Sequence, residues 1–210
     1  MKKDYKLGIL AGFLMGILFL PVLKTAEPDI YSKLVFLVLP FFIIATPLGL
    51  FIANIIGKKI ALIPQLAKFI VTGGLNALMD LGVLSLLIFL SLNYLEINPS
   101  GVILEIGIII TFYSIFKAIS FIVANTNSYF WNKYWTFDQK NKNKTEFLQF
   151  FTVSLVGFIL NVSVASYVFG FIDPFFGLNI DQWGLMGAIA GSIIGLFWNF
   201  IGYKLIVFKK

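Results

Sequence analysis

Long runs of apolar residues, separated by short polar stretches, dominate this chain. A helix needs about 20 apolar residues to cross the roughly 30 Å hydrocarbon core of a bilayer. The pattern therefore predicts an all-α integral membrane protein with six transmembrane helices. The fourth run is longer than a bilayer requires, so we expect it to tilt or to extend beyond the membrane. The six runs lie near residues 7–23, 34–56, 69–92, 103–131, 147–172 and 184–207.

The first run has two interpretations. It is short and follows Lys2, Lys3 and Lys6, as the apolar part of a signal peptide does. However, Lys24 stands where a small residue is needed before a cleavage site. We favour an uncleaved helix.

The polar stretches between the runs divide the chain into five segments. The clearest divider is the stretch after Phe137, which is rich in Lys and Asn. The predicted segments are an N-terminal two-helix extension (1–57), an interfacial linker (58–68), a first helical hairpin (69–137), a cytoplasmic polar loop (138–146) and a second helical hairpin (147–210).

The lysines predict the orientation of the helices. All 16 basic residues are lysines, and most precede the first run, lie in alternate connections or close the chain. The connections on the opposite side carry only Lys24 and Lys33. The positive-inside rule therefore places both termini in the cytoplasm, and the protein in the cytoplasmic (inner) membrane. No separate basic domain exists that would bind nucleic acid.

Composition supports the membrane assignment and excludes several kinds of chemistry. The chain is 59% hydrophobic and 12% charged, against about 45–50% and about 25% in soluble domains. It has no Cys and no His, which excludes disulfides, thiol catalysis, imidazole acid–base catalysis and zinc sites built on those ligands. No hydrolysis motif or paired-carboxylate loop is present. We therefore expect neither an enzyme nor a bound cofactor.

The two predicted hairpins look like copies of one unit. Each closes with aromatic residues, then a lysine (Lys133 or Lys204), then a phenylalanine four positions later. Near the start of each hairpin, Gly73, Asn76 and Asp80 correspond to Ser154, Gly157 and Asn161. Because each unit has two spans, both units enter the membrane from the same side. This predicts parallel-topology two-helix repeats.

This pattern resembles the GtrA-like family of polytopic membrane proteins over roughly residues 66–208. Residues 1–57 depart from the four-helix plan of that family. The opening motif matches at Phe69, Gly73 and Asn76, and the first closing motif matches at Tyr129, Asn132, Lys133, Trp135 and Phe137, with Ser128 where Asn is usual. The second closing motif matches at Asn199, Phe200, Lys204 and Phe208, with Tyr203 where Asn is usual and Ile206 in place of Trp.

The resemblance implies that the protein moves polyprenyl-phosphate-linked sugars across the membrane for cell-surface polysaccharide synthesis or glycosylation. A polyprenyl-phosphate glycolipid and membrane lipid are then the expected partners. Two alternatives remain open: a non-transporting membrane subunit that docks a glycosyltransferase, and a small-molecule exporter with Asp80 as its coupling acid. An enzyme acting on a lipid is disfavoured by the missing His and Cys.

Two charged residues fall inside predicted spans. Asp80 lies about 18 Å along its helix from Lys68, and Lys117 lies about 24 Å from Lys133. A lone charge at that depth costs about 2.5–3.5 kcal/mol on insertion scales. We therefore expect Asp80 and Lys117 to face each other, either as a structural ion pair or as a substrate or coupling-ion site that opens during transport.

Polar side chains continue from Lys117 toward the end of the fourth run. Ser120, Ala124 and Asn127 share its helical face, Asn125 lies beside that face, and Asn132 leads on to Lys133. This stripe either lines a path for a sugar or phosphate, or supplies hydrogen bonds between helices. Asn76 and Asn199, from the repeat motifs, complete the candidate substrate-binding residues.

Three lysines at predicted cytoplasmic helix ends, Lys68, Lys133 and Lys204, are candidates for binding a lipid phosphate. The alternative is that they only extend to the membrane surface and fix topology. The neighbouring Trp131, Tyr134 and Trp135 are typical of interfacial aromatics. Glycines four apart, at 8, 12 and 16 and at 187, 191 and 195, allow close helix packing within the chain or between copies of it.

Overall fold

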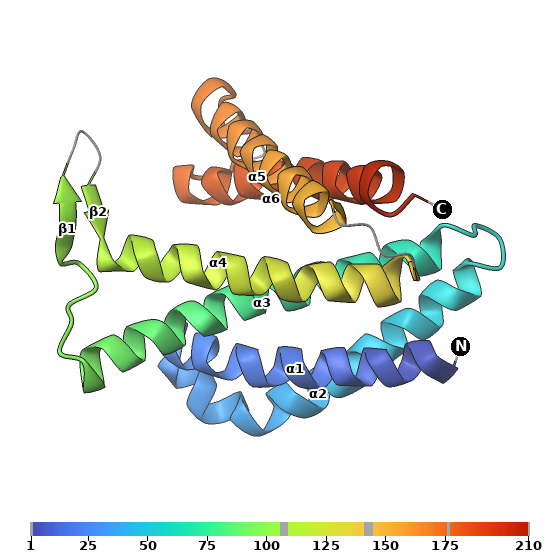
Figure 1. Cartoon of the computed structure of the whole chain (residues 1–210), viewed down its shortest axis with the longest axis horizontal. Helices are drawn as coiled ribbons and strands as arrows, with labels where there is room; N and C mark the ends of the chain where they lie inside the picture. The colour runs from blue at the N-terminus through green and yellow to red at the C-terminus, as the bar shows by residue number, and fades with distance from the viewer. Residues whose placement is uncertain (1, 106–108, 141–144, 176, 210) are drawn as a thin grey trace. The chain divides into compact units, whose positions relative to one another are not determined.

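The computed structural model describes residues 2–105, 109–140, 145–175 and 177–209, and most of them are helical (Figure 1). Contacts along the chain divide it into two units, residues 1–138 and residues 139–210. The first unit holds α1 (Lys2–Ala26), α2 (Pro28–Ile56), α3 (Ile63–Tyr94) and α4 (Phe112–Trp131), and the second holds α5 (Glu146–Phe171) and α6 (Ile180–Gly202).

Length and composition make this a multi-pass membrane protein, as the sequence predicts. Among the described residues, α1, α2, α3, α5 and α6 with its continuation to Val207 are long and apolar enough to cross a bilayer. α4 does not meet this criterion, because polar residues such as Lys117 and Asn125 interrupt its apolar character. A sixth transmembrane helix at α4 therefore stays a prediction.

The expectation of one long fourth span, 103–131, is wrong in its first part. Residues Val102–Glu105 (β1) and Ile109–Thr111 (β2) pair as antiparallel strands, and α4 begins only at Phe112. The β-branched residues of this stretch favour extended structure. Thr111 then starts the helix, because its side chain accepts a hydrogen bond from the Ser114 amide while the Ser114 side chain bonds back to the Thr111 amide.

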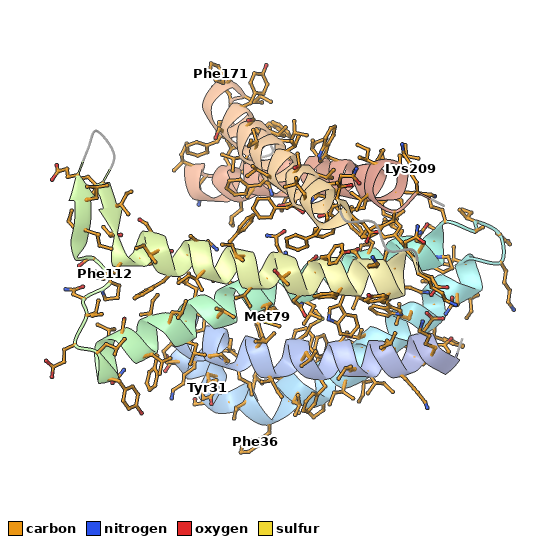
Figure 2. All side chains as sticks on the ribbon, viewed as in Figure 1. Tyr31, Phe36, Met79, Phe112, Phe171 and Lys209 are labelled. Carbon is orange, nitrogen blue, oxygen red and sulfur yellow. The ribbon has the colours of Figure 1, made fainter. Side chains whose placement is uncertain are left out.

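The first unit has a strongly apolar surface and several fully buried polar side chains, unlike a typical soluble protein. Figure 2 shows Phe36 pointing away from α2, and this side chain is 86% exposed. By contrast, the polar side chains of Thr72, Ser120 and Asn132 are no more than 2% exposed. Apolar residues outside and polar residues inside are the distribution expected for helices that face lipid.

Glycines pack α1 directly against α2. A Cβ atom at Gly12 would collide with the backbone carbonyl of Phe42, and one at Gly16 would lie 2.8 Å from the Leu39 side chain. In the second unit a Cβ atom at Gly191 would likewise collide with the carbonyl oxygen of Asn161. Both glycine stripes therefore serve packing within the chain, while association of copies through them stays untested.

The N-terminal extension and the first hairpin share one core. Ala11 of α1, Leu50 of α2, Leu75 of α3 and Trp135 form a buried cluster. α3 begins at Ile63, so the later part of the predicted linker 58–68 is already helical. In Figure 1 the N-terminal end of α1, the start of α3 and the end of α4 lie at the same end of this unit.

Both hairpins end in the same unusual turn. The chain passes from α4 into a π-helix at Asn132–Thr136 (η1), and from α6 into a π-helix at Tyr203–Val207 (η2). The amide of Phe137 then bonds to the carbonyl of Asn132 at 2.9 Å, and that of Phe208 to Tyr203 at 2.7 Å. Single π-turns are rare and are often found at functional sites.

Candidate functional site

An ion pair joins α3 to α4 within the first unit. The Lys117 ammonium contacts Asp80 Oδ2, and the Ser120 hydroxyl donates a 2.6 Å hydrogen bond to Asp80 Oδ1. The prediction that Asp80 and Lys117 face each other is confirmed. The carboxylate is thus compensated by one cation and one hydroxyl, which lowers the cost of holding it among membrane helices.

The pair lies closer to one end of α4 than the expected span implied. Because α4 begins at Phe112, Lys117 is only about 8 Å from the first residue of its helix. Its side chain is 42% exposed, against 21% for Asp80. Lys117 is therefore near one end of its helix, and the depth of the pair in the membrane stays a prediction. The pair connects the middle of α3 to the first turns of α4.

Four candidate asparagines carry the amide atoms that lack a hydrogen-bond partner. In the described part of the chain, every buried side-chain nitrogen or oxygen without a partner belongs to one of them: Asn76 Oδ1, Asn127 Nδ2, Asn132 Oδ1 and Asn199 Oδ1. A buried polar atom without a partner costs about 1–3 kcal/mol. Three of these atoms are acceptors and one is a donor, so a ligand rich in hydroxyl groups, which both donate and accept, would stabilise them most.

The hydrogen bonds of two other amide groups run along their own helix. Asn125 Nδ2 donates to the Phe121 carbonyl at 3.1 Å, and Asn132 Nδ2 donates to the Ser128 carbonyl at 2.9 Å. Such bonds back to the preceding turn are common for polar residues inside helices. Neither of these two bonds connects two helices, whereas the bond from Ser120 of the same stripe to Asp80 does, as the alternative role for the stripe predicts.

Lys68 is bound by a carboxylate from the N-terminal extension. Asp4 Oδ1 lies 2.6 Å from Lys68 Nζ and accepts a 3.2 Å hydrogen bond from Trp135 Nε1. The Lys68 and Asp4 side chains are 21% and 22% exposed. Lys68 is therefore held in an ion pair, and Trp135, which is 3% exposed, belongs to the core instead of to an exposed interfacial belt.

The closing turn of the first hairpin is tied to α3 beside this ion pair. The Thr72 and Thr136 hydroxyls lie 3.3 Å apart, and Gln65 Nε2 donates a 3.3 Å bond to the Thr136 carbonyl. The Phe69 and Phe137 rings also meet edge to face, with centroids 6.5 Å apart. These contacts fix the π-turn, and with it Trp135, to the start of α3.

The two equivalent closing lysines have different surroundings. Lys133 is 5% exposed, donates a 3.1 Å hydrogen bond to the Tyr129 hydroxyl, and lies 5.9 Å from the centre of the Tyr134 ring. Lys204 is exposed and lies 5.8 Å from the centre of the Phe200 ring. The two residues belong to different units, so their convergence on one anion stays a prediction.

In the second unit, the candidate residue Asn199 packs directly against Gly157. A Cβ atom at Gly157 would collide with the Asn199 side chain. Beside this contact the Ser154 and Tyr203 hydroxyls lie 2.6 Å apart, and Tyr203 stacks on Phe150 with centroids 4.3 Å apart. Gly157 occupies the repeat position that Asn76 occupies in the first hairpin. The Asn199 side chain fits there because glycine has no side chain.

Sequence reasoning missed Asp4 and Tyr129 as members of these clusters. An aspartate among N-terminal lysines carries no local signal of its contact with Lys68. Tyr129 and Lys133 are four residues apart on one helix, and this spacing could have signalled their contact. No group of three or more His, Cys, Asp or Glu residues able to hold a metal occurs among the residues that the structure covers.

Comparison with known proteins places the chain in a family. The GtrA/DPMS, transmembrane domain model matches residues 68–208, which is more than half of the 210 residues. No curated protein and no solved structure matches the chain. The N-terminal extension lies outside the matched region, as the four-helix plan of the family predicted. The chain therefore belongs to the GtrA/DPMS transmembrane-domain family.

Proposed function

We propose that this protein is a transporter, or flippase, for a sugar linked to polyprenyl phosphate. Membership of the family implies involvement in the translocation of such sugars or in glycosylation. The observation that carries the finer proposal is the set of partnerless amide atoms on Asn76, Asn127 and Asn132, all within the first unit. Amide groups of this kind can bond to sugar hydroxyls as the head group passes between the helices.

In this proposal each part of the substrate has its own environment. The lysines at the cytoplasmic helix ends bind the phosphate, the polar side chains of the interior pass the sugar, and the lipid tail stays in the bilayer. The protein makes and breaks no covalent bond. Movement is driven by a gradient or by supply and removal of the substrate, and the Asp80–Lys117 pair is the candidate for coupling to an ion.

The proposed arrangement in the membrane is a pair of parallel two-helix repeats preceded by the N-terminal extension. It is supported by the π-turn that closes each hairpin and by the ring contacts of Phe137 with Phe69 and of Phe208 with Phe150. Both hairpins then close on the same side, which the lysine distribution makes cytoplasmic.

We expect reporter domains fused to either terminus to be found in the cytoplasm. Fusions in the connection between α3 and α4, and in that between α5 and α6, should be found on the opposite side. The measurement is labelling of intact cells with a reagent that does not cross the membrane. A terminus labelled from outside would contradict the parallel repeats and the positive-inside argument together.

The direct test of transport is reconstitution of the full chain in vesicles with a fluorescent polyprenyl-phosphate sugar. We expect the protein to accelerate transfer of the labelled head group between leaflets. An unchanged transfer rate with correctly inserted protein would contradict the flippase and favour the non-transporting subunit. Export of a soluble sugar or other small molecule without lipid movement would favour the exporter.

Replacing Lys133 and Lys204 together by Gln is expected to weaken binding of the lipid-linked sugar. A basic residue near the membrane surface contributes about 1 kcal/mol to binding an anionic lipid, so the double variant should lose roughly tenfold or more in affinity. Lys209→Gln is the matched control, since Lys209 is exposed like Lys204 and follows the second π-turn. Equal affinity in the unaltered protein, the double variant and Lys209→Gln would mean that Lys133 and Lys204 only anchor the protein in the membrane.

A further inference from the structure

The carboxylate of Asp4 lies where two donors of the family domain converge. Its Oδ1 is 2.6 Å from Lys68 Nζ and 3.2 Å from Trp135 Nε1. Lys68 and Trp135 belong to the region matched by the family, whereas Asp4 comes from the N-terminal extension. A cation and an N–H group aimed at one oxygen form the kind of charge-assisted arrangement that also binds a phosphate oxygen.

We propose that Lys68 and Trp135 form a binding site for the phosphate of a prenyl-phosphate lipid, and that Asp4 occupies this site as an intramolecular competitor. The N-terminal extension is then an autoinhibitory element, which releases the site when the lipid phosphate displaces Asp4. This inference rests on the proposed function for the identity of the lipid. It adds the place where the phosphate binds and the device that regulates its binding.

An apolar groove beside the site fits the hydrocarbon part of such a ligand. The groove has a volume of about 180 Å³ and is lined by Leu7, Leu10, Phe130, Trp131, Tyr134 and Trp135. Trp135 belongs to both places, because its ring lines the groove while its N–H group donates to Asp4. An anion site continuous with an apolar groove selects an amphiphile over a free phosphate ion.

The Asp4 side chain can leave Lys68 and Trp135 while the N-terminal extension stays packed in the first unit. α1 is held to α2 by the close approach of Gly12 to Phe42 and to the core by Ala11, both well beyond the first turn of α1. Two further polar links lie at this end. Asn54 Nδ2 donates a 3.4 Å hydrogen bond to the Tyr5 hydroxyl, which also holds α1 to α2. Lys3 lies 3.5 Å from Asp138, with both side chains about two thirds exposed. Exposed pairs of this kind contribute little to stability.

A purely structural tie and a competitor predict opposite results for Asp4→Asn. If Asp4 only anchors α1, its neutralisation lowers thermal stability and leaves lipid affinity unchanged or reduced. If Asp4 competes for the site, its neutralisation raises the affinity for a phosphorylated lipid. Asp138→Asn is the matched control, since it removes the same charge at the same end of the unit from an exposed pair.

The experiment measures binding of farnesyl phosphate to the purified full chain in lipid nanodiscs, with farnesol and inorganic phosphate as comparison ligands. We expect Asp4→Asn to bind farnesyl phosphate about fivefold to tenfold more tightly than the unaltered protein, the effect of one charge-assisted contact. Asp138→Asn should change the affinity less than twofold. Adding Lys68→Gln to Asp4→Asn should abolish the gain.

Other outcomes would overturn the inference. An affinity in Asp4→Asn no higher than in Asp138→Asn rejects the competitor, and tight binding of farnesol or of inorganic phosphate alone rejects a lipid-phosphate site. Absence of farnesyl phosphate binding in every variant rejects the site itself. If Asp4→Asn does not fold, Trp135→Phe keeps an aromatic side chain and removes the N–H group. Farnesyl phosphate binding that this change leaves unaltered likewise rejects the site.

The assay uses neither a sugar nor transfer between leaflets, so its result is independent of the transport test. Binding regulated by Asp4 in a protein that fails to move lipid-linked sugar would reject the flippase and keep this site. Transport without any effect of Asp4→Asn on farnesyl phosphate binding would keep the flippase and reject this site.

Discussion

Replacing either member of the Asp80–Lys117 pair alone is expected to destabilise the protein more than replacing both. Asp80→Asn leaves the ammonium of Lys117 without its carboxylate, and Lys117→Ala leaves the carboxylate of Asp80 with only the Ser120 hydroxyl. An isolated charge among membrane helices costs about 2.5–3.5 kcal/mol, with the smaller effect expected for Asp80→Asn because Lys117 is 42% exposed.

The measurement is the midpoint of thermal unfolding in mild detergent for both single variants and the double variant. In the double variant no charge is left alone, so its midpoint should lie above those of both single variants. Ser120→Ala is a useful comparison, since it removes the 2.6 Å hydrogen bond to Asp80 and keeps both charges. If the fall in midpoint of the double variant equals the sum of the two single falls, the two charges do not stabilise each other.

The pair also separates a structural role from a transport role. If the double variant recovers stability and still transfers labelled lipid-linked sugar in vesicles, the pair is structural. If it recovers stability but loses transfer, the pair is part of the transport pathway. The structure establishes the contact itself, and this experiment assigns its role.

Gly12→Ala is expected to be among the most destabilising single changes in the first unit. The added methyl group would collide with the backbone carbonyl of Phe42, and neither backbone can yield without separating α1 from α2. Overpacking of this kind costs about 1–3 kcal/mol, although alanine is otherwise a better helix former than glycine by about 1 kcal/mol.

Gly49→Ala is the matched control for this prediction. Gly49 lies in α2, and a Cβ atom built there would meet nothing within 4 Å. This change should leave the thermal midpoint unchanged or raise it slightly through helix propensity. A Gly12→Ala protein as stable as Gly49→Ala would show that α1 and α2 do not pack as closely as the structure has them.

The helical membrane class of this protein follows from local patterns in its sequence. Apolar runs near 34–56 and 147–172 are long enough to specify helices by length and composition alone. The pairing of Asp80 with Lys117 was also predictable, because a charge in an apolar environment requires a partner. The helix predicted over 103–111 was wrong for a local reason too. An apolar run rich in β-branched residues is compatible with a strand as well as with a helix.

Only the tertiary structure decided which residues far apart in the chain contact one another. The sequence by itself determined the family, the apolar helices and the identity of the polar residues among them. It did not determine that Lys68 is paired with Asp4, that Trp135 donates to the same carboxylate, or that Ser120 bonds to Asp80 across two helices. The physical reason is that such contacts depend on how helices pack, and packing brings together side chains whose local sequence carries no record of their partners.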